Sequence, residues 1–349
     1  MASHKDDYRQ HKLVLTGSDP VPVEINSGVI IKRQDMKTTQ EEADTIIVQQ
    51  VAEVKAKKVL VVADDTDIFV LLLHFCCQGD IPVSTSVLMV SPIHGRAVID
   101  INATVDQHRE IIPDLLAAHG LTGCDTVATY FGIGKAVALR VLRAGVYARS
   151  YIGDTSRVLS EITSQATPFI LACYGQTRCT SLTEARQEMW ASKVGRSVAG
   201  APKLASLPPT NEAFKENVAR AHLQVAVWRN ALQPDPPRMD PTAFGWSRED
   251  GSKTLFPTTL PSDIPLAPDD LLKLVRCSCS SEIPCKTQRC GCNSANFACS
   301  VFCACQGGQH CFNERTKQAL QADDDDENDD VSQLNPGTYT HLYPSANTQ

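Results

Sequence analysis

Apolar residues along the first part of this chain follow the periods of strands and helices, which predicts an α/β fold. The run 59–63 is continuously apolar between charged neighbours, as is typical of a parallel strand that is buried on both faces. Further strands are expected at 83–90 and 97–101. We therefore expect a parallel sheet that is covered by helices.

The helical spacing of apolar residues predicts the elements around this sheet. Thr39 and Glu42 have the spacing of a capping box, so a helix is expected to begin at Thr39 and to cover the sheet. Helices are also expected at 68–75 and 111–119. The best-patterned helix spans 214–232. Its apolar stripe fits packing on the core, and the alternative of a protein partner bound through the 214–232 helix stays open.

The formal net charge of −7 over 349 residues comes from one short stretch. Between Asp323 and Asp330 all residues but Asn328 are acidic, so the remainder of the chain is close to neutral. Such a run repels itself and is expected to form a solvated, disordered tail over 319–349. The 42% of hydrophobic residues is enough for a packed core, whereas a nearly neutral chain would attract nucleic acid only modestly at long range.

No segment has the pattern of a secretion signal or a membrane span. The N-terminal residues contain no apolar stretch, and nowhere do about 18 apolar residues follow one another. We therefore expect a nuclear or cytoplasmic protein, with the nucleus favoured, and no membrane partner. In such reducing compartments, free thiols and metal sites are more common than disulfides.

The densest chemical signal is a cluster of nine cysteines near the C-terminus. They are Cys277, Cys279, Cys285, Cys290, Cys292, Cys299, Cys303, Cys305 and Cys311. An odd number cannot pair completely into disulfides within the segment, whereas metal ligation has no such rule. Nine thiolates can surround about three zinc ions tetrahedrally if some sulfurs bridge two ions. The cysteines therefore predict a zinc cluster, with a disulfide module as the alternative.

The spacing of these cysteines, with Cys-Ser-Cys at 277–279 and Cys-Gly-Cys at 290–292, resembles the CXC domain of tesmin-like proteins. That resemblance implies a fold around three zinc ions and binding to DNA. In the tesmin-like branch two repeats act together, and a tyrosine before the central C-x-C contacts the minor groove. Here there is one repeat, and Arg289 holds the place of the tyrosine. Lys286 and Arg289 are the candidate nucleic-acid contacts of this segment.

Acidic residues gather where the predicted strand at 59–63 ends. Asp65 and Asp67 follow it closely, and ligands in open α/β sheets bind beyond the carboxyl ends of the strands. Carboxylates in that place can hold a divalent cation. The alternative without a ligand is that Asp67 and Asp125 cap the helices that follow them.

In the order of its motifs the chain is similar to flap endonucleases and PIN-like nucleases. The matching stretches are, in chain order, Glu42-Ala43-Asp44, Asp65-Thr66-Asp67, Gly123-Cys124-Asp125 and Gly132-Ile133-Gly134. The resemblance implies hydrolysis of a phosphodiester by Mg²⁺ ions, with these acidic ligands: Glu42, Asp44, Asp65, Asp67 and Asp125. It also implies a grip on the nucleic-acid backbone by a second group: Gly132, Gly134, Lys135 and Arg140.

Two features decide how far this resemblance extends. Residues two apart on a helix point away from each other, so Glu42 has to lie in the non-helical cap if it is to join Asp44 at one site. The related nucleases also carry further acids on an N-terminal strand and helix, and the polar residues 1–38 offer no equivalent. We therefore expect an incomplete nuclease-like core, and no catalytic residue is assigned.

From about Gln40 to Asn313 the chain resembles uncharacterised metazoan proteins of mobile-element character, which combine such acidic stretches with a terminal CXC module. The expected architecture is an irregular segment at 1–38, a PIN-like core at 39–200, an amphipathic helix and Pro-rich linker at 201–270, a CXC zinc-cluster domain at 271–318 and an acidic tail at 319–349. The favoured function is zinc-dependent binding of nucleic acid, as DNA or chromatin, with a degenerate nuclease-like domain. An active Mg²⁺-dependent, structure-selective nuclease and a protein-interaction scaffold are the alternatives.

Overall fold

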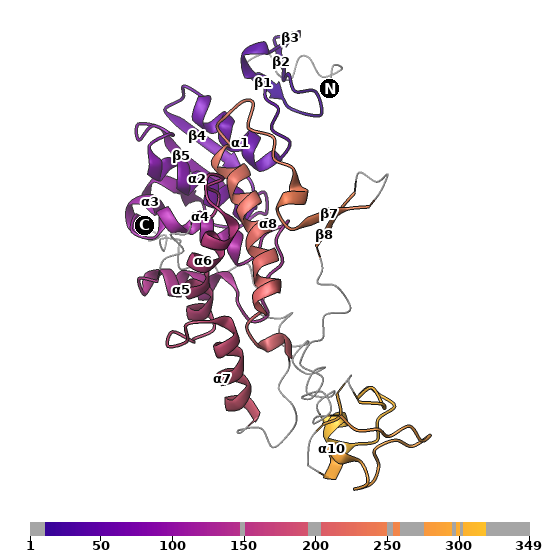
Figure 1. Cartoon of the computed structure of the whole chain (residues 1–349). Helices are drawn as coiled ribbons and strands as arrows, with labels where there is room; N and C mark the ends of the chain where they lie inside the picture. Colours follow the sequence, from indigo (N-terminus) through magenta and orange to yellow (C-terminus); the bar gives the residue numbers. More distant parts are fainter. Residues whose placement is uncertain are drawn as a thin grey trace.

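A computed structural model of the chain has a mixed α/β fold with small sheets (Figure 1). It describes residues 11–146, 151–194, 204–249, 254–258, 276–294, 298–300 and 303–318. The predicted acidic tail lies outside these residues, as do residues 259–270 of the predicted linker and 271–275 of the predicted CXC domain. Within the described part of the chain, no helix is both long enough and apolar enough to cross a membrane.

The first described residues form a small antiparallel sheet. Its strands are β1 (Lys12–Leu15), β2 (Val23–Asn26) and β3 (Val29–Lys32), paired in that order. Ser27 and Gly28 connect β2 to β3 with positive φ angles of 48° and 80°. This two-residue turn suits the right-handed twist of a hairpin, which is why a glycine is favoured there.

The second sheet contains the predicted strands, of which the second and third are shorter than expected. β4 (Lys58–Val62) pairs in parallel with β5 (Ser86–Val90), whereas β6 (Ile99–Asp100) pairs with β5 in the antiparallel direction. The expectation of a purely parallel sheet was therefore wrong for the third strand. The side chain of Asp100 accepts a hydrogen bond from Ala103, so it caps the next helix and ends the strand after two residues.

The parallel pair is buried on one face only, which corrects the expectation of a strand covered on both sides. Val61 and Met89 are buried on one face, whereas Leu60 and Val62 on the other face are 56% and 61% exposed. A groove of about 740 Å³ runs between this strand, the first helix and β1. The described residues therefore form two layers at this sheet rather than three.

Helices supply most of the core. In chain order they are α1 (Ala43–Glu53), α2 (Thr66–Gln78), α3 (Ile101–His108), α4 (Ile112–Leu121), α5 (Lys135–Arg143), α6 (Leu159–Cys173), α7 (Leu182–Val194) and α8 (Asn211–Arg229). α4 packs against both α2 and α8, and α6 also packs against α8 (Figure 1). The sequence patterns had not predicted α3 or α6.

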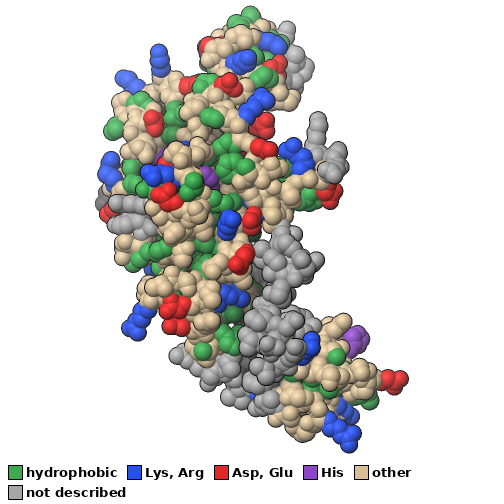
Figure 2. All heavy atoms as spheres, viewed as in Figure 1, with side chains coloured by type: hydrophobic (Ala, Val, Ile, Leu, Met, Phe, Trp, Pro, Cys, Tyr) green, Lys and Arg blue, Asp and Glu red, His purple; other side chains and the backbone are tan. Residues whose placement is uncertain are grey.

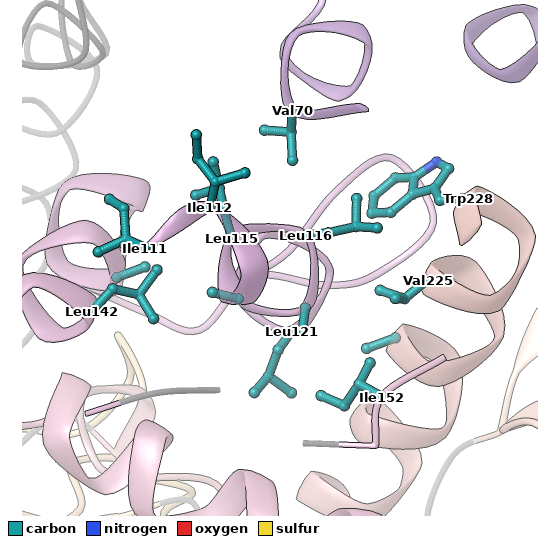
Figure 3. Close-up of a cluster of buried hydrophobic side chains, with 14 of the residues drawn as sticks. Val70, Ile111, Ile112, Leu115, Leu116, Leu121, Leu142, Ile152, Val225 and Trp228 are labelled. Carbon is teal, nitrogen blue, oxygen red and sulfur yellow. The ribbon is translucent and has the colours of Figure 1, made fainter. Parts of the chain in front are cut away.

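The long helix α8 packs inside the domain, in the way that its apolar stripe favours. Phe214, Val218, Val225 and Trp228 on this stripe are all buried. Figure 3 shows Val225 and Trp228 pointing from α8 toward the apolar side chains of α4. The stripe is therefore occupied by the core, and it is not offered to a partner helix in this structure.

The start of α1 differs from the predicted capping box. Glu42 is the N-cap, with extended backbone angles (φ −86°, ψ 133°), and the helix begins at Ala43 rather than at Thr39. The Thr39 hydroxyl donates to Asp235 instead, at 2.8 Å. The prediction of a helix start at Thr39 was wrong, but the requirement that Glu42 lie in the non-helical cap is met.

The segment after α8 lies against that helix. The 3₁₀ turn at Pro241–Ala243 leads into a hairpin of β7 (Trp246–Arg248) and β8 (Leu255–Pro257). The Phe244 ring lies 5.7 Å from the His222 ring, and Arg220 donates to the Gly245 carbonyl at 2.9 Å. This part of the predicted linker is thus ordered on the core.

Candidate metal centres

The nine C-terminal cysteines converge on one point of the fold. Seven of their side chains are buried, and those of Cys279 and Cys305 are partly buried. All fourteen cysteines of the chain lie in described residues, and none of them forms a disulfide. The disulfide alternative is therefore not what the structure shows.

The distances between the sulfur atoms fit zinc rather than disulfides. A tetrahedral ion with Zn–S bonds of about 2.3 Å separates its ligands by about 3.8 Å, whereas a disulfide requires about 2.05 Å. The closest sulfur pairs are Cys277–Cys285 at 3.5 Å, Cys292–Cys303 at 3.6 Å, Cys277–Cys305 and Cys305–Cys311 at 3.8 Å, Cys290–Cys299 at 3.9 Å and Cys277–Cys299 at 4.0 Å. A cysteine cluster with these spacings could hold zinc ions.

Seven of the nine sulfurs fall into overlapping groups of four, and those of Cys303 and Cys311 lie beside these groups. These groups are Cys277, Cys290, Cys292 and Cys299; Cys277, Cys285, Cys299 and Cys305; and Cys277, Cys279, Cys285 and Cys290. Cys277 belongs to all three groups, and several other sulfurs belong to two. Such sharing is what bridging ligands require when sulfurs are too few to give each ion four of its own.

Backbone N–H groups point at several of these sulfurs and favour the thiolate. Cys303 Sγ accepts from the N–H groups of Cys277 (3.3 Å) and Ser300 (3.4 Å). Burial raises the pKa of Cys303, but these two donors, together with hydrogen bonds from the Cys292 and Ser300 side chains, lower the pKa overall. For Cys290, burial is likewise outweighed, chiefly by the Asn293 N–H, and the pKa falls to about 7. Thiolates are the form that binds metal.

The loops around the cysteines are held tightly. Gly307 has a φ of 59°, and a Cβ there would lie 2.4 Å from the Cys299 carbonyl oxygen, so the loop requires glycine. The short helix α10 (Gly291–Ser294) carries Asn293, whose side chain donates to the Cys285 carbonyl at 2.9 Å. Between the buried Cys285 and Cys290, the loop residues 286–289 are exposed. Lys286 and Arg289 are thus presented on a loop that is fixed at both ends.

A second candidate centre lies where β4 ends. Oxygens of Asp44, Asp65 and Asp67 all lie within 4.8 Å of one another. Asp44 stands in the first turn of α1, and Asp65 and Asp67 stand at the start of α2, directly after the strand. Three of the five predicted acidic ligands therefore meet at one point, and these carboxylates could hold a divalent cation.

The capping alternative applies to a different residue from the one predicted. Asp65, not Asp67, is the N-cap of α2, and its side chain accepts from the Asp67 N–H at 2.8 Å. Asp125 lies exposed in a turn, and the next helix has Gly134 as its N-cap. Capping therefore explains neither Asp67 nor Asp125.

The other two predicted ligands lie beside the three that meet. Gln224 of α8 donates to both Glu42 oxygens at 3.0 Å and accepts from Thr126 at 2.6 Å. This chain of bonds ties Glu42 to the turn that carries Asp125. Burial raises the pKa of Glu42, and the charges of Asp67 and Asp125 add to the rise. Glu42 and Asp125 are thus electrostatic neighbours of the three, without joining their group.

Repulsion among these acids contributes to a raised pKa of Asp44. Burial raises the pKa of Asp44 to about 6, and a further cause is the repulsion from its acidic neighbours, Asp65, Asp67, Glu42 and Asp125. A divalent cation at this place would offset that repulsion. The acids therefore form a single electrostatic unit.

The predicted phosphate-binding loop is only partly oriented for that role. Gly132 and Gly134 are exposed just before α5, whereas Arg140 is exposed in the last turn of that helix. The Lys135 ammonium points inward, where it donates to the carbonyls of His119 (2.6 Å) and Gly123 and lies 3.2 Å from the Thr122 hydroxyl. Burial lowers the pKa of Lys135 to about 8. Lys135 thus holds the end of α4 in this structure rather than facing a phosphate.

Three residues of this site were not assigned to it from the sequence, which favoured a helix-end role for His119 and a place in the apolar stripe for Trp228. His119 Nε2 lies 2.6 Å from Asp67 Oδ1, and Gln224 and Trp228 face Glu42 from α8. Gln224 and Trp228 are four residues apart, which places them on one face of a helix, but nothing in the sequence says that this face meets the acids.

Comparison with family models, curated proteins and solved structures finds no match to this chain.

Proposed function

We propose that this chain is a zinc-dependent nucleic-acid-binding protein whose cysteine segment is a CXC-type module that contacts DNA. The observation that carries the proposal is the convergence of nine sulfurs at tetrahedral spacings around a fixed, exposed loop with two cations. About three zinc ions with bridging sulfurs would satisfy nine ligands. The zinc would act as structural support, and Lys286 and Arg289 would make the contacts.

The charge of the segment supports binding of a backbone rather than strong long-range attraction. Exposed cations on the segment include Arg276, Lys286, Arg289 and Lys317, against the exposed acids Glu282 and Glu314. Figure 2 shows basic side chains projecting from the outer end of this segment. Nine thiolates on three zinc ions would return about three negative charges, so contacts would be short-range and salt-sensitive.

We expect the double variant Lys286→Ala/Arg289→Ala to bind duplex DNA more weakly than the wild type. If each residue contacts one phosphate, the slope of log affinity against log salt should fall by about 2. Fluorescence anisotropy of the zinc-loaded full chain at several salt concentrations measures both quantities. Lys215→Ala is the matched control, since Lys215 is exposed on α8. Unchanged affinity and slope in the double variant, with zinc still bound, would contradict the proposal.

The acidic group favours a second candidate, a Mg²⁺-dependent phosphodiesterase of the PIN-like or flap-endonuclease type. Its support is the meeting of Asp44, Asp65 and Asp67 at the carboxyl end of β4. Bound Mg²⁺ would activate water and stabilise the leaving oxygen. The chain's own part would be to hold the ions through the three carboxylates and to keep Glu42 and Asp125 beside them.

Under this second candidate, the full chain with Mg²⁺ should cleave flap or nicked DNA, and Asp65→Asn should reduce cleavage to background. The carboxylate oxygens bind the cation, and an amide lacks the charge that holds it. Asp106→Asn serves as the control, because Asp106 lies exposed on α3 and pairs with Arg109 at the surface. Cleavage that survives Asp65→Asn, or no cleavage by the wild type, would exclude this activity at this site.

A further inference from the structure

The buried contact between His119 and Asp67 stands out within the acidic group. The two side chains lie 2.6 Å apart, and the residues are only 3% and 7% exposed. In the ionised form that binds a cation, the Asp67 carboxylate can only accept, so in that form the His119 Nε2–H donates to it. Because Asp67 has a second oxygen, this bond fixes the carboxylate while leaving an oxygen for a cation.

His119 is itself held at its ring and at its backbone carbonyl. Its ring centroid lies 5.7 Å from that of the buried Trp228 on α8. Its carbonyl oxygen accepts from the Lys135 ammonium, which also bonds the Gly123 carbonyl in the turn leading to Asp125. The elements that carry Asp67 and Asp125 are therefore joined through one buried network.

A second, independent observation points into this group of acids. The Trp228 indole N–H is buried and makes no hydrogen bond within the described residues. It lies near the Glu42 carboxylate, close enough to oppose the rise that burial causes in the pKa of Glu42, but not in the geometry of a hydrogen bond. An unused buried donor costs free energy. A carboxylate that turns on binding a cation, or a water on that cation, would give this donor an acceptor.

We propose that His119 is a positioning residue that holds Asp67 in the orientation needed to bind a divalent cation, an inference that rests on the acidic centre proposed above. Histidines that hydrogen-bond to ligating groups are typical supports of metal sites, and their loss costs about 10- to 100-fold in metal affinity. A purely structural histidine would stabilise the fold without altering cation binding in the folded protein.

The test compares two polar replacements that differ by one methylene. His119→Gln places an amide N–H near the position of Nε2 and should keep an affinity close to that of the wild type, whereas His119→Asn is too short to reach Asp67. Mn²⁺ binding to the full-length protein, measured by electron paramagnetic resonance, should be about 10- to 100-fold weaker for His119→Asn. Thermal unfolding without Mn²⁺ confirms that each variant is folded, and His119→Leu replaces His119→Asn if the latter does not fold.

The double variant Asp44→Asn/Asp65→Asn separates failure of the inference from failure of the site. It keeps all other acidic residues of the chain, so only the difference from the wild type reports on this centre. If the double variant binds Mn²⁺ as well as the wild type does, the acidic residues do not form a cation site. The proposed role of His119 is then excluded as well. If the centre binds Mn²⁺ but folded His119→Asn binds it as tightly as the wild type, His119 does not position Asp67. The same conclusion follows if His119→Gln binds Mn²⁺ as weakly as His119→Asn.

Discussion

Replacing Cys277 with serine is expected to release zinc from the cysteine cluster and to unfold the segment that carries it. Cys277 Sγ lies within 4.0 Å of three other sulfurs and belongs to every group of four. A serine hydroxyl is a poor zinc ligand beside a thiolate. The loss of this one sulfur would therefore disturb more than one ion, in contrast to the loss of Cys279, which belongs to one group.

The expected effect is large because the segment has little else to hold it together. Its apolar core consists of cysteine side chains. Structural zinc contributes about 10 to 16 kcal/mol to the folding of small zinc domains, so metal loss and unfolding occur together. A strong chelator should have the same effect on the wild-type segment and should leave the α/β domain folded.

Native mass spectrometry of the full-length protein measures this prediction by counting bound ions. The wild type should carry about three zinc ions, and Cys277→Ser should carry fewer. Cys77→Ser is the matched control, because Cys77 is a partly buried cysteine of α2 outside the cluster. A wild-type protein without bound metal, or one whose C-terminal cysteines are oxidised in pairs, would overturn the zinc assignment.

Trp228→Ala is expected to destabilise the α/β domain by about 3 to 5 kcal/mol, because it leaves a cavity in the core. Trp228 is 1% exposed and is among the largest fully buried side chains. It packs where α8 approaches α4 most closely: a Cβ on Gly120 would lie 3.5 Å from the Trp228 ring and 2.7 Å from Val225. Helices in such close contact cannot collapse far into the space that a lost indole leaves.

Chemical unfolding of the full-length protein, followed by circular dichroism, measures this loss of stability. Trp190→Ala is the control, since Trp190 on α7 is 38% exposed and its removal should cost about 0.5 kcal/mol or less. Similar unfolding midpoints for the two variants would show that Trp228 does not occupy a closely packed core.

Local sequence patterns predicted where strands and helices lie better than they predicted which of their faces are buried and what they contact. The apolar run before Asp64 is β4, and the stripe from Phe214 to Trp228 is the buried face of α8. The same run did not reveal that Leu60 and Val62 remain exposed, because a continuous apolar strand has the same sequence whether one face or both are covered. Thr39 had the spacing of a cap, but its hydroxyl bonds Asp235, which no local pattern can indicate.

For the candidate sites, too, the sequence predicted the ligating residues but not the residues that support them. Cysteine spacing predicted the converging sulfurs, and the motifs around Asp44, Asp65 and Asp67 predicted acids that do meet. The supports of the acidic centre were beyond prediction because they depend on how α4 and α8 pack. His119 and Gln224 are ordinary polar residues within helical patterns, and only tertiary contacts bring them to Asp67 and Glu42.

The contact between Gln40, just before α1, and the end of α8 has a consequence for synthesis on the ribosome. The Gln40 side chain donates to the carbonyls of Asn230 (2.8 Å) and Gln233 (2.9 Å), about 190 residues further along the chain. Contacts of such long sequence separation form slowly, and only after both partners exist. During synthesis, the acidic motifs near Gln40 therefore lack their contacts with α8 until α8 has left the ribosomal exit tunnel. We expect chaperones to matter most during this period of translation.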